Sequence, residues 1–393
     1  MSMKKLSKKM LAVVAAGAMT MGLAMPVFAV DGATTPDTKN NAKEAYIKKT
    51  YNTEVNKPMK FNFTATQVTT GDYIVTKELK CTIPSIEFTS TDLNGGEGTY
   101  TKLSDKITFE TPTEAGKYEY TVTESATTDP VVTNNDYVKL IMSQAEYKMD
   151  VYVVEKSGAL EIDKILVNKV KDDNGNPDST TGKVDIGNNK DNGFNFTNTY
   201  VQEAGTGETP NPTKPDPDYT KYGSLNVSKK IDAQDGTPST TDTFSFTAKF
   251  AFPKGTDVDT LGAKAGENKL ELKTDGTYTF NLKHNENMKF TGLPVGTKIT
   301  VTETGAANYK GSASVVLNGG DAKIVAAEKY HEDLTAVNGD NDKLGQNKNT
   351  VDVTNTYNHV PTTGIIMNTL PYVLMIALCG AALFGFVAFK RRR

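Results

Sequence analysis

A short alternating segment occurs twice in this chain and constrains what the chain can fold into. Residues 194–200 read Phe-Asn-Phe-Thr-Asn-Thr-Tyr, and residues 351–357 read Val-Asp-Val-Thr-Asn-Thr-Tyr. If both are β-strands, alternation places on one face of each strand Phe194, Phe196, Asn198 and Tyr200, and Val351, Val353, Asn355 and Tyr357. Each apolar face therefore carries one amide. A buried amide without a partner costs about 1–3 kcal/mol, so each asparagine is expected to meet a polar side chain.

The two ends of the 393-residue chain are processing and targeting segments. Residues 1–29 combine a basic head, an apolar core and the small-residue pattern Val27-Phe28-Ala29, which predicts a secretory signal peptide. Residues 30–41 are polar and are expected to be disordered. Residues 365–389 are almost wholly apolar and 390–393 are basic, which predicts a transmembrane segment with a cytoplasmic basic tail.

Composition excludes some classes of function and of stabilisation. Between the signal peptide and Gly364 the chain has 36 basic against 47 acidic residues, a net charge of about −11, and no arginine. A basic groove for nucleic acid is therefore not expected. Cys81 is the single cysteine of this part, since Cys379 lies in the apolar tail. An internal disulfide is excluded although the protein is predicted to be exported.

The remainder reads as an all-β protein of two domains. Short alternating segments are separated by Gly and Asn clusters, and no segment has sustained helical periodicity, which favours two β-sandwiches in tandem. We expect an N-terminal domain over 42–200 and a C-terminal domain over 222–358. Residues 201–221 contain four prolines and are predicted to be an extended interdomain linker.

Each domain offers three polar residues on otherwise apolar strand faces, in the same order. They are Lys49, Glu124 and Asn198 in the first domain, and Lys229, Glu303 and Asn355 in the second. The Lys-to-Glu spacings are 75 and 74 residues, and the Glu-to-Asn spacings are 74 and 52. The alternative is that each is a solvated residue at a strand end, as an isolated lysine usually is. Because the order repeats, we favour one shared buried site in each domain.

Burial would make such a site reactive. It moves the pKa of a lysine down and that of a glutamate up, by as much as about 3–5 units, which favours a neutral amine and a neutral acid. The neutral amine is a nucleophile, and the acid can hydrogen-bond the asparagine carbonyl and relay protons to the leaving NH₂. The expected product is an isopeptide bond with release of ammonia. The reaction occurs once per domain and needs no cofactor.

The order Lys, Val-Thr-Glu, Thr-Asn-Thr-Tyr resembles the isopeptide-linked pilin domains of Gram-positive bacteria. The resemblance is greatest to FctA-type streptococcal backbone pilins, whose domains are CnaB-like, immunoglobulin-like sandwiches. It implies that Lys49 joins Asn198 with the help of Glu124, and that Lys229 joins Asn355 with the help of Glu303. Lys48 is adjacent to Lys49 and is the alternative nucleophile of the first domain.

A second motif precedes the apolar tail. Its five residues are Val360, Pro361, Thr362, Thr363 and Gly364, and together with the tail they resemble the LPXTG sorting signal read by sortases. The resemblance implies cleavage between Thr363 and Gly364. Val360 stands where the family usually has Leu, which leaves the sortase class open. The alternative is a plain C-terminal membrane anchor.

The acceptor lysine for the next subunit is also implied by the resemblance. In such pilins it lies shortly before the last strand of the N-terminal domain, where this chain has Lys190, with Lys183 and Lys171 as rivals. The predicted function is therefore a structural pilus shaft subunit at the cell surface. Its predicted partners are a sortase, identical subunits or cell-wall peptide, and accessory pilins.

Two other classes of function are alternatives. The first is a monomeric wall-anchored adhesin or stalk, which the same export and sorting segments would serve. The second is an enzyme acting on an external substrate. It is disfavoured because the three histidines are scattered and no metal-ligand spacing is seen. Neither a metal nor a cofactor is expected.

Overall fold

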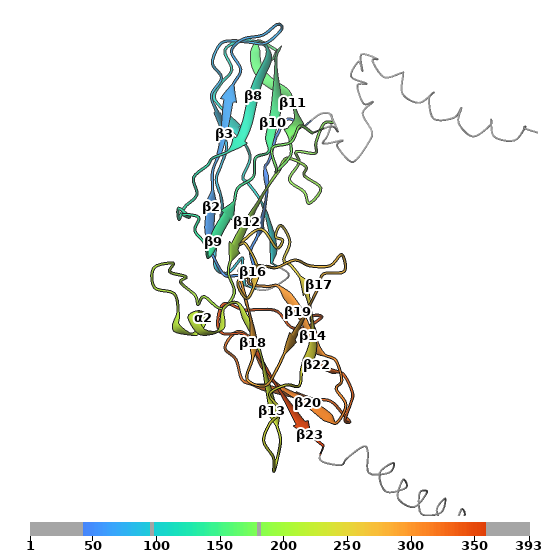
Figure 1. Cartoon of the computed structure of the whole chain (residues 1–393). Coiled ribbons are helices and arrows are strands. Elements are labelled where there is room, and N and C mark those ends of the chain that lie inside the picture. The colour runs from blue at the N-terminus through green and yellow to red at the C-terminus, as the bar shows by residue number, and fades with distance from the viewer. Residues whose placement is uncertain (1–41, 95–97, 179–181, 359–393) are drawn as a thin grey trace, which may run out of the picture.

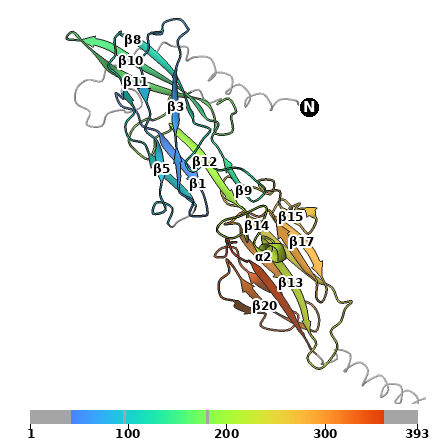
Figure 2. The same ribbon diagram turned by 90° about the vertical axis from the view of Figure 1, so that its left-hand side faces the viewer.

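The computed structural model describes residues 42–94, 98–178 and 182–358. They form two β-sandwich domains stacked end to end, as two views at right angles show (Figures 1 and 2). The all-β prediction is confirmed. The predicted signal peptide, the 30–41 segment, the sorting motif, the transmembrane segment and the basic tail lie outside the described residues. Among the described residues, no helix has the length and apolarity needed to cross a bilayer.

The first domain has two four-stranded sheets and two small ones. One sheet orders its strands as β6 (Thr99–Leu103), β1 (Lys48–Asn52), β12 (Asn195–Gln202) and β9 (Val138–Ile141). The facing sheet is β11 (Ala159–Lys171), β10 (Glu146–Lys156), β8 (Gly116–Glu124) and β3 (Phe63–Gln67). The small sheets pair β2 (Met59–Phe61) with β5 (Ile86–Phe88), and β4 (Cys81–Thr82) with β7 (Thr108–Phe109).

The second domain repeats this plan. Its larger sheet is β16 (Asn268–Lys269), β15 (Lys264–Ala265), β18 (Asn287–Thr291), β13 (Leu225–Asp232), β23 (Thr350–Tyr357), β20 (Tyr309–Val316) and β21 (Lys323–Ala326). Its facing sheet is β17 (Thr277–Leu282), β14 (Phe244–Ala251), β19 (Lys298–Glu303) and β22 (Leu334–Val337). In both domains the first and last strands are parallel neighbours, β1 with β12 and β13 with β23.

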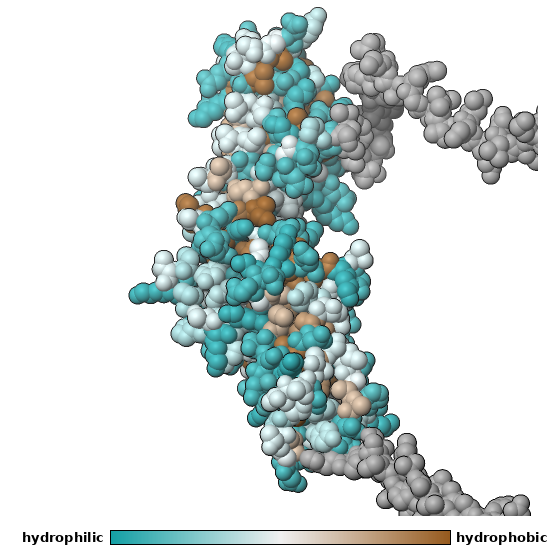
Figure 3. Space-filling view, in the orientation of Figure 1, coloured by the Kyte–Doolittle hydropathy of each residue, from teal (hydrophilic) through white to brown (hydrophobic). Residues whose placement is uncertain are grey.

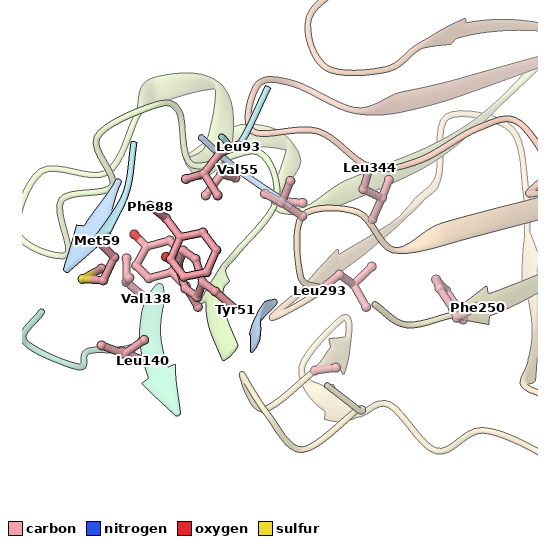
Figure 4. Close-up of a cluster of buried hydrophobic side chains, with 14 of the residues drawn as sticks. Tyr51, Val55, Met59, Phe88, Leu93, Val138, Leu140, Phe250, Leu293 and Leu344 are labelled. Carbon is pink, nitrogen blue, oxygen red and sulfur yellow. The ribbon is translucent and has the colours of Figure 1, made fainter. Parts of the chain in front are cut away.

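The apolar cores form one cluster that continues through the junction between the domains. Figure 4 shows Tyr51 and Leu93 of the first domain at the end that faces Leu293 and Leu344 of the second. All four side chains are buried. Because these buried side chains meet at the junction, the domains are joined by a packed contact and not only by a flexible linker.

The face of the molecule in Figure 3 is mostly hydrophilic, with small separate apolar patches.

The segment expected to be an extended linker, 201–221, starts inside this contact. Strand β12 runs to Gln202, and residues 201–206 are buried. The backbone N–H of Ala204 donates to Leu293 O at 2.8 Å, and that of Val295 donates to Gln202 O at 2.7 Å. The end of β12 is thus tied directly to the second domain. The later part includes one short helix, α2 (Pro217–Tyr222), capped by Asp216.

Candidate functional site

In the first domain, Lys49, Glu124 and Asn198 meet in the core. Lys49 lies on β1 and Asn198 on the neighbouring β12, while Glu124 ends β8 of the facing sheet. Lys49 Nζ lies 2.7 Å from Glu124 Oε1, and Asn198 Nδ2 donates to the same oxygen at 3.0 Å. The lysine and glutamate side chains are 0% and 1% exposed. A triad bridging the two sheets is therefore sealed from water.

The second domain has the same arrangement. Lys229 on β13 and Asn355 on β23 face Glu303, which ends β19 of the opposite sheet. Lys229 Nζ lies 2.8 Å from Glu303 Oε1, and Asn355 Nδ2 donates to that oxygen at 2.8 Å. The side chains of Lys229 and Glu303 are 0% and 3% exposed. The alternative of solvated residues at strand ends does not describe either triad.

Strand register places each lysine diagonally beside its asparagine. Asn198 pairs with Tyr51, two residues after Lys49, and Asn355 pairs with Ile231, two residues after Lys229. Side chains two apart share a face, so lysine and asparagine point into the same core. Of the two adjacent lysines in β1 only Lys49 reaches the triad. Lys48 points away and donates from Nζ to Lys190 O at 3.2 Å.

A second pair of buried amides holds this register. Asn192 donates to Tyr46 O and Gly187 O, and Asn349 donates to Ser224 O and Gly345 O. Each therefore ties the loop before the last strand to the segment before the first strand. Both stand six residues before the asparagine of the triad, a repeat that is visible in the sequence but was not predicted from it.

Burial shifts the pKa values of both triads towards the neutral forms of lysine and glutamate. Burial lowers the pKa of Lys49 and of Lys229 to about 8, against the opposing effect of the paired carboxylate. Burial also raises the pKa of Glu124 and of Glu303. The ring of Phe61 lies 4.4 Å from Lys49 Nζ, and that of Phe244 lies 4.2 Å from Lys229 Nζ. These rings keep water from the amines, so a proton can pass from nitrogen to carboxylate within the core.

The contact between acid and amide differs from the expected one. The acid was expected to hydrogen-bond the amide carbonyl, but each glutamate contacts the amide nitrogen, Nδ2. In the first domain the carbonyl Oδ1 of Asn198 instead accepts from the backbone N–H of Ser143 at 2.7 Å. In the second, Asn355 Oδ1 is buried and has no donor among the described residues. An added Cβ at Gly311, opposite Asn355, would lie 3.2 Å from this oxygen.

Neither Ser143 nor Gly311 was predicted from the sequence. Ser143 donates from its backbone N–H, and the residue type does not reveal such a contact. Gly311 leaves space for Asn355 at a buried position of β20, a strand whose residues alternate between buried and partly exposed. A glycine inside a strand signals a close approach of other groups, so Gly311 could have been noticed.

The candidate acceptor lysines lie outside the core. Lys190 is exposed on a turn, five residues before β12 begins at Asn195. Lys183 is exposed and forms a β-bridge with Asn168. Lys171 ends β11 and pairs with Glu146 at 2.7 Å. Lys190 and Lys183 are therefore the more accessible of the three, and Lys171 is engaged.

Other reactive groups are few in the part of the chain that the structure describes. No group of three or more His, Cys, Asp or Glu residues there could hold a metal ion. Cys81 is half-buried, and burial raises the pKa of its thiol to about 12. It is therefore a poor nucleophile.

The second domain matches a family model that has no assigned function. Residues 223–357 match a family model described as Domain of unknown function (DUF7601). No curated protein matches the chain. The family match covers about a third of the chain, so it describes this domain and not the whole protein.

Solved structures that are similar include pilins. A major pilin from Streptococcus pyogenes is 18% identical, with 80% of this chain and 98% of that chain covered, at a TM-score of 0.32. The major pilin protein T3.2 from S. pyogenes serotype GAS13637 is 19% identical, with 81% of this chain and 99% of that chain covered and a TM-score of 0.31. A pilus-presented adhesin is 18% identical over 50% of this chain and 36% of that chain, at 0.25. At these TM-scores and identities the matches are reported as similarities, and no role is assigned to this chain from them.

Proposed function

We propose that this chain is a pilus shaft subunit of a Gram-positive bacterium, whose two domains each form a Lys–Asn isopeptide bond. The observation that carries the proposal is the repetition of one buried triad, at one strand register, in two domains. A solitary buried lysine would be costly without a compensating role. This chain has two buried lysines, each beside an acid and an amide. A reaction that turns the lysine amine into an uncharged amide accounts for both.

The reaction is a transamidation that each domain performs once on itself. The neutral Nζ of the lysine attacks Cγ of the asparagine, and the protonated glutamate gives its proton to Nδ2. The C–N bond to Nδ2 breaks, ammonia leaves, and the glutamate takes the surplus proton from Nζ. The products are one amide bond and one ammonia, and the glutamate is unchanged. On this proposal each domain acts on itself, in a single turnover.

The bond fits a mechanical role because of the strands that it would join. Tension along a shaft enters a domain at its first strand and leaves by its last. In both domains these strands are parallel neighbours. A covalent link between them carries load past all the strands between. Parallel strands pulled at opposite ends would otherwise have only their shared hydrogen bonds to resist sliding.

Intact mass spectrometry tests the isopeptide bonds. We expect purified residues 30–363 to weigh less than the translated sequence by two molecules of ammonia. Peptide mapping should then find Lys49 joined to Asn198 and Lys229 joined to Asn355. A measured mass equal to the translated mass would refute the proposal.

Assembly is the other half of the proposal. We infer that a sortase cleaves after Thr363 and joins it to Lys190 of the next subunit or to cell-wall peptide, with accessory pilins as further partners. The sorting motif, Val360 to Gly364, lies outside the described residues, so this inference rests on the sequence. Cell-wall extracts boiled in detergent should give a ladder of very large species that Lys190→Ala abolishes and Lys183→Ala does not. A single wall-linked band would favour the monomeric adhesin or stalk.

A further inference from the structure

The carbonyl of Asn198 is held by a donor that the proposed reaction has not used. The backbone N–H of Ser143 lies 2.7 Å from Asn198 Oδ1, inside the core. Strand β9 stops pairing with β12 after Ile141, opposite Thr199, so the chain turns away beside Asn198. The N–H of Ser143 is thereby released from the ladder and points at a side chain.

Asp173 holds the bend that carries this N–H. Its Oδ1 accepts from Ser143 Oγ at 2.6 Å and from the backbone N–H of Thr197 at 2.8 Å. Its carbonyl accepts from the backbone N–H of Gln144 at 3.0 Å. One residue thus ties the bend to β12, the strand that carries Asn198. The donor and the amide are fixed to each other before any reaction.

The second domain lacks the corresponding donor. Strand β20 stays paired with β23 past Asn355, as far as Val316 opposite Thr350, so its backbone groups remain in the ladder at the place where β9 has turned away. Asn355 Oδ1 has no donor among the described residues, and Gly311 lies opposite it. One chain therefore contains the same triad with and without a backbone donor on the carbonyl.

We propose that the Ser143 N–H is the oxyanion donor of the first triad, and that Asp173 is the positioning residue that aims it. This inference rests on the proposed isopeptide reaction. When Lys49 Nζ attacks Cγ of Asn198, the C=O bond opens to a C–O⁻ at Oδ1, which the N–H stabilises. When the C–N bond to Nδ2 breaks, the carbonyl reforms and ammonia leaves. A fixed donor at such an oxygen is worth about 10²–10³-fold in rate.

The test compares two full-length chains that differ only in the backbone group of residue 143, which is an N–H in one chain and an oxygen in the other. One carries Ser143→Ala, and the other carries lactic acid at position 143, whose ester oxygen replaces the peptide N–H of the alanine. Both are made by cell-free translation, quenched in denaturant at successive times, and mapped for closure of each domain. We expect the ester to slow closure of the first domain by about 10²-fold. The second domain should close at the same rate in both chains, which also shows that both chains are translated and that their second domain folds.

A genetically encoded pair tests the positioning residue. Asp173→Ala removes both side-chain contacts and should slow closure of the first domain, whereas Asp173→Asn keeps an acceptor at Oδ1 and should restore most of the rate. Equal first-domain rates for the ester and amide chains, with Asp173→Ala also unchanged, would overturn the inference while leaving the isopeptide proposal intact. If neither domain of the wild-type chain closes, the proposed reaction itself is wrong, and this inference falls with it.

Discussion

Lys229 Nζ and Glu303 Oε1 lie 2.8 Å apart in the core of the second domain, and Asn355 Nδ2 lies 2.8 Å from that same oxygen. One carboxylate oxygen therefore stands between the nitrogen that we propose to attack and the nitrogen that we propose to leave. A proton can move from one to the other without crossing open space. The first domain repeats this with Glu124.

Replacing the shared carboxylate should leave its own domain open. Glu303→Gln keeps the shape of the side chain but cannot take up and return a proton. We expect this variant to lose one ammonia where the wild type loses two, with Asn355 unmodified in peptide maps. The exposed Glu328→Gln is the matched control and should lose two. A Glu303→Gln chain with both domains closed would show that the acid is dispensable.

Removing the nucleophile should weaken the second domain strongly. Lys229→Met conserves most of the volume, but the cross-link it prevents would close a loop of well over a hundred residues. By analogy with disulfides, losing it lowers the free energy of unfolding by roughly 5 kcal/mol. Thermal unfolding and resistance to protease measure this loss of stability. Lys230→Met, on the exposed face of the same strand, is the control. Equal unfolding curves for the two variants would argue against the bond.

Closure should depend on pH with a definite sign. Burial lowers the pKa of both lysines to about 8, so at lower pH a larger fraction of each amine is protonated and has no lone pair for attack. Newly translated chain should therefore close slowly in acid and faster as the pH is raised towards about 8. At higher pH the rate should fall again, because the glutamate must carry the proton that it gives to Nδ2. Timed quenching and intact mass measure this rate, and a rate that does not fall in acid would contradict the assigned nucleophile.

The junction between the domains should depend on Glu203. Its buried carboxylate accepts from Tyr219 Oη at 2.6 Å, from Ser224 Oγ at 2.8 Å and from the backbone N–H of Gly292. These bonds tie the end of β12 to the start of β13 and bypass the loop between them. Glu203→Ala removes three hydrogen bonds to a buried acid, each worth about 1.5–3 kcal/mol if it is charged.

We expect Glu203→Ala to loosen the two domains from each other while both cross-links still form. Small-angle scattering should show a broader distribution of shapes, and calorimetry should separate the unfolding of the two domains. Glu208→Ala, an exposed change a few residues further along, should leave both measurements unchanged. A rigid Glu203→Ala variant would mean that the apolar contact alone fixes the junction.

The linker shows where composition misled. Four prolines among polar residues predicted an extended tether over 201–221, yet its first six residues are buried. A composition rich in proline and polar residues predicts an extended conformation only for a segment that makes no tertiary contacts. Here Ala204 and Glu203 find partners in the second domain, which lie about 90 residues further along the chain.

The sequence by itself determined the all-β class and the inward faces of the two triads. Alternation has a period of two, so an apolar stripe containing Lys49, Glu124 or Asn198 reveals which way each side chain points. It does not reveal which strands become neighbours, because pairing depends on segments far apart in the chain.

Only the tertiary structure decided three things: that the glutamates come from the facing sheet, that they contact the amide nitrogen, and that Ser143 offers its N–H to one carbonyl and not the other. A backbone N–H is common to every residue except proline, so its direction is set by where a strand leaves its ladder and not by residue type.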